Sequence, residues 1–351
     1  GTVGGEFVVS ASGTTQPITP TNVQIQRQSS YGAANIDAVQ IENVTMFVQR
    51  AKRKIRELVY NLNIDQYQAQ DMTLLAEHIT EGGITEMAYQ QEPDSILWCV
   101  RSDGTLLGFT YARAEEVVGW HRHVVGGAFS SGNAVVESVA SIPTDANEDE
   151  LYVIVKRTIN GTTRRYVEYL TLFDYGTDQT DAFYVDSGLT YSGSAATVIT
   201  GLDHLEGQSV TILADGSTHP NKTVSGGAIT LERSSTKVHV GLGYTSLLQT
   251  MRVEAKGEEA TSQSKTKRIN EVTLRLHESV GVEVGSSLSD MERIPFRSSA
   301  AAMSSAVPLF TGDKQVEFRD DFNTDGFVYV RQTQPLPLTV ISIYPMITVN
   351  D

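Results

Sequence analysis

Two groups of residues in this 351-residue chain have types and spacings that metal chemistry could use. His121 and His123 lie two residues apart in the segment WHRH, which reads as a strand, so their side chains share one face. Such a pair could hold a metal ion or supply a catalytic imidazole. No third His, Cys or carboxylate follows at a recognisable ligand spacing, although distant residues could supply one. Strand histidines packed inside or between sheets are commoner, and we favour that interpretation.

The second group is the DFNTDG segment, whose Asp321, Asn323 and Asp325 match the first half of an EF-hand calcium loop. The second half of that loop does not match. Position twelve is Gln332 instead of the bidentate Glu that the site needs, and Phe327–Arg331 reads as a strand. We therefore favour a hairpin turn that uses Asn, Asp and Gly for their backbone tolerance. No metal and no cofactor are expected.

No other residue pattern indicates an enzyme. The single cysteine, Cys99, lies inside an apolar strand, where burial raises a thiol pKa and makes the sulfur unreactive. The chain has no phosphate-binding glycine loop, no dinucleotide fingerprint and no GxSxG motif. A glycosidase-type carboxylate pair would be distant in sequence, and 42 Asp and Glu residues offer no way to choose two. We expect no catalytic activity.

The charge balance argues against a protein that grips nucleic acid. Lys and Arg number 27 against 42 Asp and Glu, a formal net charge of -15, whereas phosphate binding needs a clustered basic surface. The one cationic run, residues 50–56 (RAKRKIR), could contact nucleic acid or an acidic neighbouring subunit. A solvated hairpin tip is the simpler explanation. No apolar run is long enough to span a bilayer, and no signal peptide is visible.

The elements around these residues repeat. Phe47–Arg50 aligns with Trp98–Arg101, and Ile55–Tyr60 aligns with Leu106–Tyr111, in both cases at an offset of 51 residues (98 − 47 and 106 − 55). A third copy spans about 151–170. The middle copy predicts four strands at 84–89, 96–102, 106–113 and 117–125, with Asp103-Gly104 as the strongest hairpin signal. Four strands per repeat of ~40–50 residues are typical of β-propeller blades, and three copies are too few to close a propeller. An ordinary antiparallel meander is the alternative.

The remaining segments extend a mainly β prediction. We expect propeller-like repeats over 1–185, a small β-barrel or sandwich over 186–255, and a C-terminal β segment over 256–351. Outside the repeats, strands are expected at 6–11 (without a partner), 209–213, 228–231, 237–240, 269–276 with an extension over 280–284 after a break at Glu278–Ser279, 315–319, 326–332 and 338–349. Asp71 could cap a short helix, Met72–His78. Residues 254–268 are expected to form an exposed loop and 285–314 an irregular segment.

Several strings of residues resemble one protein family. They include residues 87–125 (MAYQQEPDSILWCVRSDGTLLGFTYARAEEVVGWHRHVV), 267–285 (KRINEVTLRLHESVGVEVG), 328–349 (VYVRQTQPLPLTVISIYPMITV) and TPTNVQIQRQSSYG near the start. The chain is similar in them to the tail tubular (nozzle) proteins of short-tailed bacteriophages and their prophages. The resemblance covers most of residues 20–350 and rests on ordinary residues, without a catalytic signature.

The resemblance implies a structural virion protein of the phage tail, assembled in the bacterial host cytoplasm. It implies a homohexameric ring below the portal and its adaptor, with contacts to other tail proteins and a central channel through which DNA passes without specific binding. It also implies a longer protein with segments before Gly1. We expect acidic side chains to line the channel, although the sequence does not identify them. The alternative is a β-rich receptor- or glycan-binding tail protein, perhaps with depolymerase activity.

Overall fold

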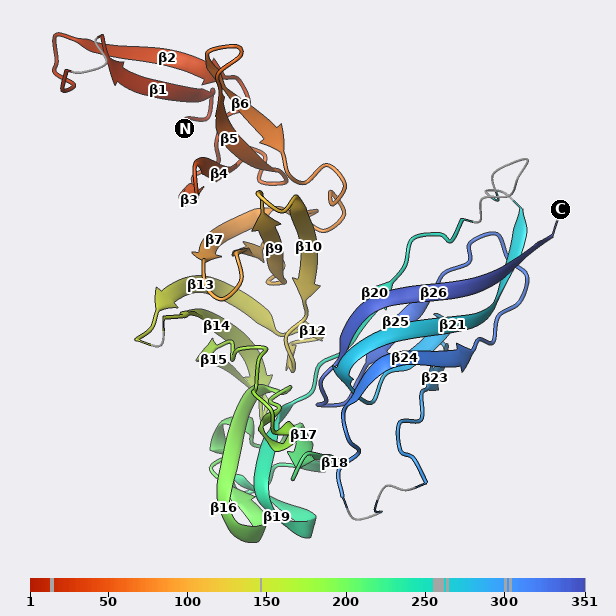
Figure 1. Cartoon of the computed structure of the whole chain (residues 1–351). Helices are drawn as coiled ribbons and strands as arrows, with labels where there is room; N and C mark the ends of the chain where they lie inside the picture. Colours follow the sequence, from red (N-terminus) through yellow and green to blue (C-terminus); the bar gives the residue numbers. More distant parts are fainter. Residues whose placement is uncertain are drawn as a thin grey trace. The chain divides into compact units, whose positions relative to one another are not determined.

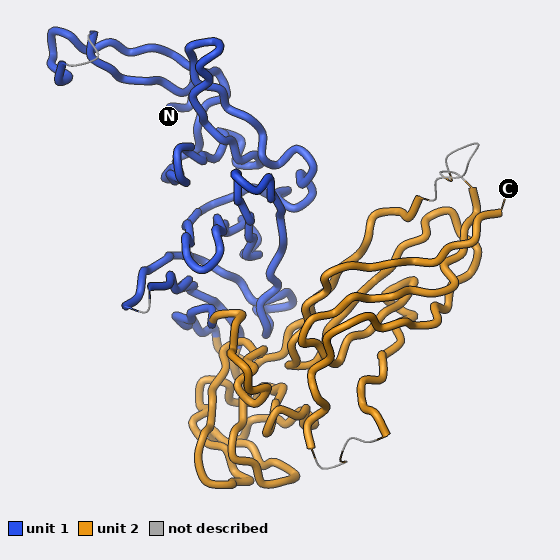
Figure 2. The backbone as a smooth tube through the Cα atoms, viewed as in Figure 1, with its two compact units in different colours: residues 1–158, 163–171 blue, residues 159–162, 172–351 orange. Residues whose placement is uncertain are grey.

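The computed structural model describes residues 1–12, 16–145, 147–254, 262, 265–299, 302 and 305–350. The chain is mainly β, with 58% strand and 2% helix, which confirms the predicted fold class at this level. The strands of the described residues form small antiparallel sheets, none of which closes on itself (Figure 1). Figure 2 shows two compact units: unit 1 holds residues 1–158 and 163–171, and unit 2 holds 159–162 and 172–351.

Unit 1 contains a two-stranded ribbon and three sheets in succession. The ribbon pairs β1 (Glu6–Ala11) with β2 (Val23–Ser29). The first sheet orders β3 (Val39–Ile41), β4 (Val44–Val48), β5 (Ile55–Asn61) and β6 (Gln66–Asp71); the second orders β7 (Ile84–Gln90), β8 (Ile96–Arg101), β9 (Leu106–Ala112) and β10 (Val117–His123). A short hairpin, β11 (Ala128–Phe129) and β12 (Gly132–Asn133), leads to the third sheet of β13 (Val135–Pro143), β14 (Asp149–Ile159) and β15 (Thr162–Tyr169).

The three repeats found in the sequence correspond to these three sheets. The aligned segments of the first two repeats lie in the second and third strands of their sheets, β4 and β5 against β8 and β9. The third repeat supplies β14 and β15 in the same order. The four strands predicted for the middle repeat are confirmed, with ends that shift by one or two residues.

The second sheet is apolar on both faces because a sheet packs against each face. Along β8, Leu97 and Cys99 join the cluster shared with the first sheet, and Trp98 and Val100 join the cluster shared with the third. All four side chains are at most 4% exposed. Burial of an apolar side chain of this size contributes roughly 1.5–3 kcal/mol, so this alternation holds the sheets together as a stack.

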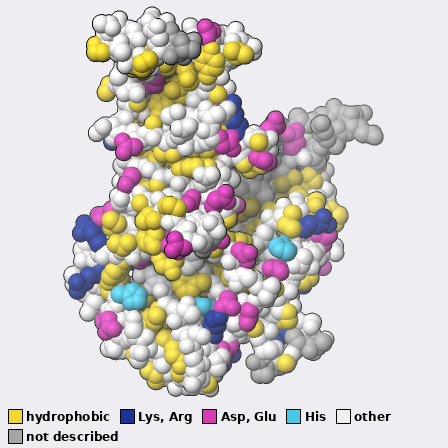
Figure 3. All heavy atoms as spheres, turned by 60° about the vertical axis from the view of Figure 1, so that its left-hand side comes forward, with side chains coloured by type: hydrophobic (Ala, Val, Ile, Leu, Met, Phe, Trp, Pro, Cys, Tyr) yellow, Lys and Arg dark blue, Asp and Glu magenta, His cyan; other side chains and the backbone are white. Residues whose placement is uncertain are grey.

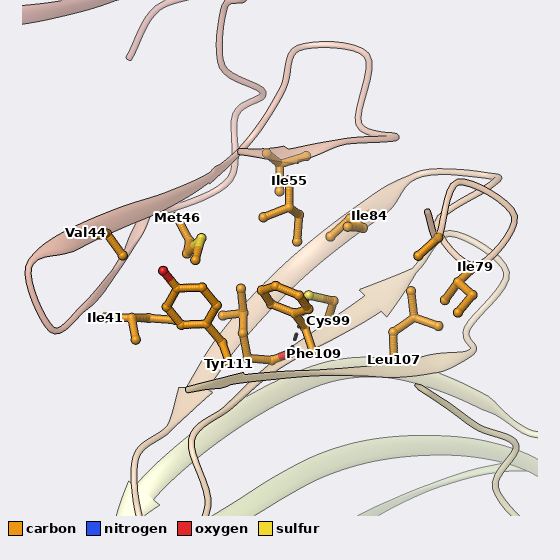
Figure 4. Close-up of a cluster of buried hydrophobic side chains, with 13 residues drawn as sticks. Ile41, Val44, Met46, Ile55, Ile79, Ile84, Cys99, Leu107, Phe109 and Tyr111 are labelled. Atoms are coloured by element: carbon orange, nitrogen blue, oxygen red, sulfur yellow. Dashed lines mark hydrogen bonds between the residues drawn. The ribbon is translucent and has the colours of Figure 1, made fainter. Parts of the chain in front are cut away.

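Figure 4 shows the cluster between the first two sheets, with Tyr111 of β9 beside Ile41 and Met46. Two further members, Ala76 and Ile79, come from the connection between the sheets. That connection was predicted to be a helix, Met72–His78, and this prediction is wrong: the segment is a series of turns. The Asp71 carboxylate accepts from the backbone N–H and the hydroxyl of Thr73, which closes a turn instead of capping a helix.

The first strand was predicted to lack a partner, and this is also wrong. β1 pairs with β2 along its whole length, with Val9 opposite Ile25 and Ala11 opposite Val23. The prediction failed because only one strand candidate was recognised before residue 35. The alternation of VQIQRQS, with an apolar residue at every second position at its start, was the overlooked signal.

Unit 2 contains two short 3₁₀ turns, η1 (Gln179–Asp181) and η2 (Asp203–Leu205). Its fourth sheet orders β16 (Asp186–Thr200), β19 (Ala228–Leu242), β17 (Ser209–Ala214) and β18 (Ser217–Thr223). The fifth orders β20 (Ser246–Gln249), β25 (Tyr329–Gln332), β22 (Glu283–Ser287) and β23 (Asp290–Arg293). The sixth orders β24 (Phe310–Glu317), β21 (Thr266–Ser279) and β26 (Thr339–Asn350), and it packs on the fifth around a common apolar core.

Several strand predictions in unit 2 need correction. The two strands predicted at 228–231 and 237–240 are one strand, β19, and the partners β16 and β18 were missed because their side chains are mostly exposed and polar. Val280–Val284 does not extend β21, since positive φ angles at Glu278 and Gly281 turn the chain into the fifth sheet. The segment predicted to be irregular contains β23 and the start of β24. The predicted loop at 254–268 lies largely outside the described residues.

Candidate functional site

The cationic run at 50–56 forms the tip of the β4–β5 hairpin, as predicted, and part of its charge is paired: Lys54 has two carboxylate partners, whereas Arg50 and Lys52 are exposed. The Lys54 ammonium lies 2.7 Å from an Asp71 carboxylate oxygen and 2.9 Å from one of Glu77. These hydrogen bonds raise the pKa of Lys54. Burial opposes ionisation of Asp71, but hydrogen bonds from Lys54 and Thr73 outweigh it and hold the pKa of Asp71 below its usual value. The tip therefore carries less free positive charge than its sequence suggests.

Arg56, the last residue of the run, is withdrawn from solvent. Its side chain is 8% exposed. The guanidinium donates to the Gln49 side chain and to the Ala69 carbonyl, both at 2.8 Å, and it stacks 3.4 Å from the centre of the Tyr31 ring. A guanidinium held in this way stabilises the outer face of the first sheet and is unavailable to phosphate.

Ion pairing with carboxylates is widespread across the described part of the chain. Within 4.0 Å of a carboxylate oxygen lie Arg53, Lys54, Arg101, Arg113, Lys156, Arg157, Arg165, Lys222, Lys237, Arg252, Arg275, Arg293, Arg319 and Arg331. On the face drawn in Figure 3, Lys and Arg form isolated patches, and Asp and Glu are spread more widely. This face does not display the continuous basic stripe that a phosphate-binding surface needs.

The predicted histidine pair lies on β10, on the face directed toward the third sheet. His121 Nδ1 and His123 Nε2 are 2.7 Å apart, so one hydrogen bond joins the rings. Both rings pack on Trp98, with centroids 5.9 and 5.0 Å from the indole. Burial lowers the pKa of His121; burial and the neighbouring His121 lower the pKa of His123 to about 4. The pair is therefore neutral at physiological pH and packs as part of the sheet interface.

The pair provides only two nitrogen ligands. No group of three or more His, Cys, Asp or Glu residues in the described ranges is placed to hold a metal ion. Gly108, opposite His121 on β9, leaves room for the imidazole: a Cβ at this position would lie 2.0 Å from His121 Cε1. The local sequence is thus arranged to pack this ring.

The DFNTDG segment uses its polar groups internally. The Asn323 side-chain oxygen accepts from the backbone N–H of Asp325 at 2.9 Å and of Gly326 at 2.7 Å, and its amide donates to Asp320 and to the Asp321 carbonyl. The Asp325 carboxylate lies 2.9 Å from Arg252 Nε. The segment is an Asn-centred turn. It connects β24 to β25, which belong to different sheets, so the hairpin part of the prediction is wrong.

Arg101 braces the Asp103-Gly104 turn of the second sheet. Its guanidinium donates to both Asp103 oxygens, at 2.9 and 2.6 Å, and to the Ile79 carbonyl at 2.8 Å. The bonds between Arg101 and Asp103 raise the pKa of Arg101 and hold the pKa of Asp103 well below its usual range. Gly104 has φ +85°, and a Cβ there would meet Val135 at 2.4 Å, so only glycine fits. The predicted hairpin is confirmed.

Cys99 is fully buried, and burial strongly raises the pKa of its thiol. It is a packing residue of the cluster between the first and second sheets.

Sequence reasoning missed one apolar surface, on the β1–β2 ribbon. The register places Val9 opposite Ile25 and Ala11 opposite Val23, and Phe7 lies on the same face as Val9. Phe7, Val9, Val23 and Ile25 are 41%, 51%, 40% and 66% exposed. We call these four side chains the ribbon patch.

No protein-family model matches this chain, and no curated protein matches it. In the described part of the chain, no helix has the length and apolar character needed to cross a membrane. The function must therefore be inferred from the chain's own residues.

Proposed function

We propose that this chain is a structural subunit of a short phage tail, part of a ring-shaped nozzle through which DNA is ejected. The residue strings that resemble tail tubular proteins support this proposal. The stacked antiparallel meanders of unit 1 support it as well, because a propeller-like set of blades is built from such sheets. In this proposal the three sheets of unit 1 are blades of an incomplete set, and the fourth sheet is part of a small barrel-like domain.

The observation that carries the conduit role is the excess of Asp and Glu over Lys and Arg, and many of the Lys and Arg side chains are also ion-paired with carboxylates. A tube that passes a polyanion must not hold it, and each phosphate neutralised by a free Lys or Arg adds to salt-dependent binding. Here Lys54 is paired with Asp71 and Glu77, and Arg56 is buried. Six subunits that each carry a formal charge of -15 would repel phosphate at short range, within a Debye length of about 8–10 Å.

The assembly that follows is a homohexamer in the virion tail, assembled in the host cytoplasm and joined to the portal adaptor and to other tail proteins. DNA passes through its channel transiently, along a wall of acidic side chains. No catalytic step, metal or cofactor is part of this role.

Negative-stain electron microscopy of the full-length protein tests the proposal. We expect six-fold rings with a central hole. Trimeric fibres, or specific binding of this chain to a glycan array, would instead identify a receptor- or glycan-binding tail protein.

A further inference from the structure

The ribbon patch is an apolar face with nothing packed on it among the described residues. The opposite face of β2 carries Gln24, Gln26 and Gln28, and the Gln28 side chain accepts from the Tyr67 backbone N–H at 3.0 Å. The ribbon is thus attached to the first sheet through its polar side, and its apolar side points away. An isolated pair of strands is marginally stable in water. Of the large apolar side chains of the ribbon, the four of the ribbon patch lie on this open face beside Arg27, and Val8 lies on the other face. A group of exposed apolar side chains of this kind is typical of a docking element.

Among the described residues, the third sheet lacks the fourth strand that the first two sheets have. We call the space beside the outer edge of β15 the vacancy. The first and second sheets each continue from their third strand to a fourth, β6 after β5 and β10 after β9. The third sheet ends at β15, and no strand of the described residues pairs with the outer edge of β15. This edge is eight residues long and largely exposed. An open edge of this length is a template for another strand.

Part of the second sheet is also uncovered on the face of β10 that points toward the third sheet. On β10, Val117, Gly119, His121 and His123 face the third sheet, and Val118, Trp120 and Arg122 face the first. On the face toward the first sheet, the Trp120 indole donates to the Met72 carbonyl at 2.8 Å, and Val118 is 52% exposed. On the other face, Val117 is 49% exposed, and a Cβ added to Gly119 would meet nothing within 4 Å. A fourth strand beside β15 would cover these two residues.

We propose that the β1–β2 ribbon of a second copy of this chain fills the vacancy. One ribbon strand pairs with the outer edge of β15, and the ribbon patch covers Val117 and Gly119 of the second sheet. The lengths agree, since β1 and β2 have six and seven residues and β15 has eight. Backbone hydrogen bonds supply the pairing, and the apolar face supplies the burial.

The ribbon of the same copy cannot reach this position. It is anchored on β6 of the first sheet, and the second sheet lies between the first and the third. Two sheet spacings of about 10 Å each separate the two sites. Ribbon and vacancy therefore lie at opposite ends of the stack in unit 1 (Figure 1). A contact between different surfaces of successive copies is heterologous, and such contacts close into rings when the rotation per copy allows it. The inference thus rests on the proposed function, for which it names the contact between subunits.

Cross-linking between two differently labelled copies of the full chain tests the contact. One copy carries Ile25→Cys on the ribbon patch, and the other carries Val117→Cys beside the vacancy. A short bismaleimide is added to the purified mixture; the native Cys99 is fully buried and does not react. We expect a cross-linked heterodimer that maps to positions 25 and 117. The matched control replaces Val117→Cys by Leu75→Cys, an equally simple change at a 94% exposed position away from the vacancy.

A second variant tests the same contact without a cross-linker. Ile25→Lys changes an exposed side chain, so the fold is not at risk, yet it should weaken self-association of the chain about tenfold or more in sedimentation velocity. Cross-linking at the level of the Leu75→Cys control, or a chain that stays monomeric at every soluble concentration, would overturn the inference. Rings of the full-length protein without this cross-link would leave the proposed function standing and remove this contact. The cross-link without six-fold rings would support this contact and count against the proposed function.

Discussion

Acidification should destabilise unit 1 through the buried histidine pair, before the carboxylates titrate. His123 has an ordinary pKa of about 6.5 in the unfolded chain, and burial together with His121 lowers it to about 4 in the folded chain. Between these two values the unfolded state binds a proton that the folded state does not. The free energy of unfolding is therefore undiminished above pH ~6.5 and falls as the pH drops toward 4.

The size of the effect follows from the shift. One pKa unit corresponds to about 1.4 kcal/mol. The protonation of His123 alone should therefore cost about 2 kcal/mol by pH 5 and roughly 3 kcal/mol by pH 4. The lowered pKa of His121 acts in the same direction. At pH 5 most Asp and Glu side chains are still ionised, so the histidines can be measured before general acid denaturation begins.

Tryptophan fluorescence during urea unfolding is a suitable assay, because both tryptophans, Trp98 and Trp120, lie in the second sheet and report on unit 1. The free energy of unfolding is compared at pH 7 and pH 5 for the unsubstituted chain and for His123→Gln, which removes the titrating ring. His78→Gln, at an exposed turn position, is the matched control. We expect His123→Gln to reduce the loss between the two pH values by about 2 kcal/mol, and His78→Gln to leave it unchanged. Equal losses in all three chains would refute the reasoning.

Three further outcomes follow from the packing. Glu168→Gln should lower the free energy of unfolding of unit 1 by about 3–5 kcal/mol in the same urea assay, because it leaves the fully buried Arg157 guanidinium without its carboxylate partner. Gly108→Ala should lower the free energy of unfolding by about 1–3 kcal/mol, since its Cβ would overlap the imidazole packed against it. The control Gly119→Ala should leave it nearly unchanged, and equal effects of the two substitutions would contradict the packing. The native chain should not react with a thiol reagent until it unfolds, because burial raises the pKa of Cys99, and rapid labelling in native buffer would show that the strand opens.

The repeats could be predicted because local signals agreed with one another. The Asp103-Gly104 turn has a backbone that only glycine adopts without strain, and the alternation of apolar residues on both faces of Ile96–Arg101 required a neighbour on each side. Because the first repeat aligns with the second at an equal offset of 51 residues, the same strands could be predicted for the first sheet. The mainly β fold class, the strand positions of the second sheet and the packing role of Cys99 followed from such short-range patterns.

Contacts between distant segments could not be predicted. The side chains of Ala76 and Ile79 become buried only when two sheets close over them, and the sequence of Met72–His78 alone gave no sign of this, so a helix was predicted there. Likewise, the carboxylates that neutralise Lys54 lie 17 and 23 residues further along the chain (71 − 54 and 77 − 54). A one-dimensional charge run says nothing about which acidic side chains the fold will bring to it.

The central proposal is that this chain forms part of a hexameric conduit that passes DNA without binding it. The most direct measurement is a reconstruction of the full-length protein by electron cryomicroscopy at a resolution that shows side chains. We expect six subunits around a central channel whose wall is predominantly acidic. A trimeric fibre, or a channel lined mainly by Lys and Arg, would contradict the claim.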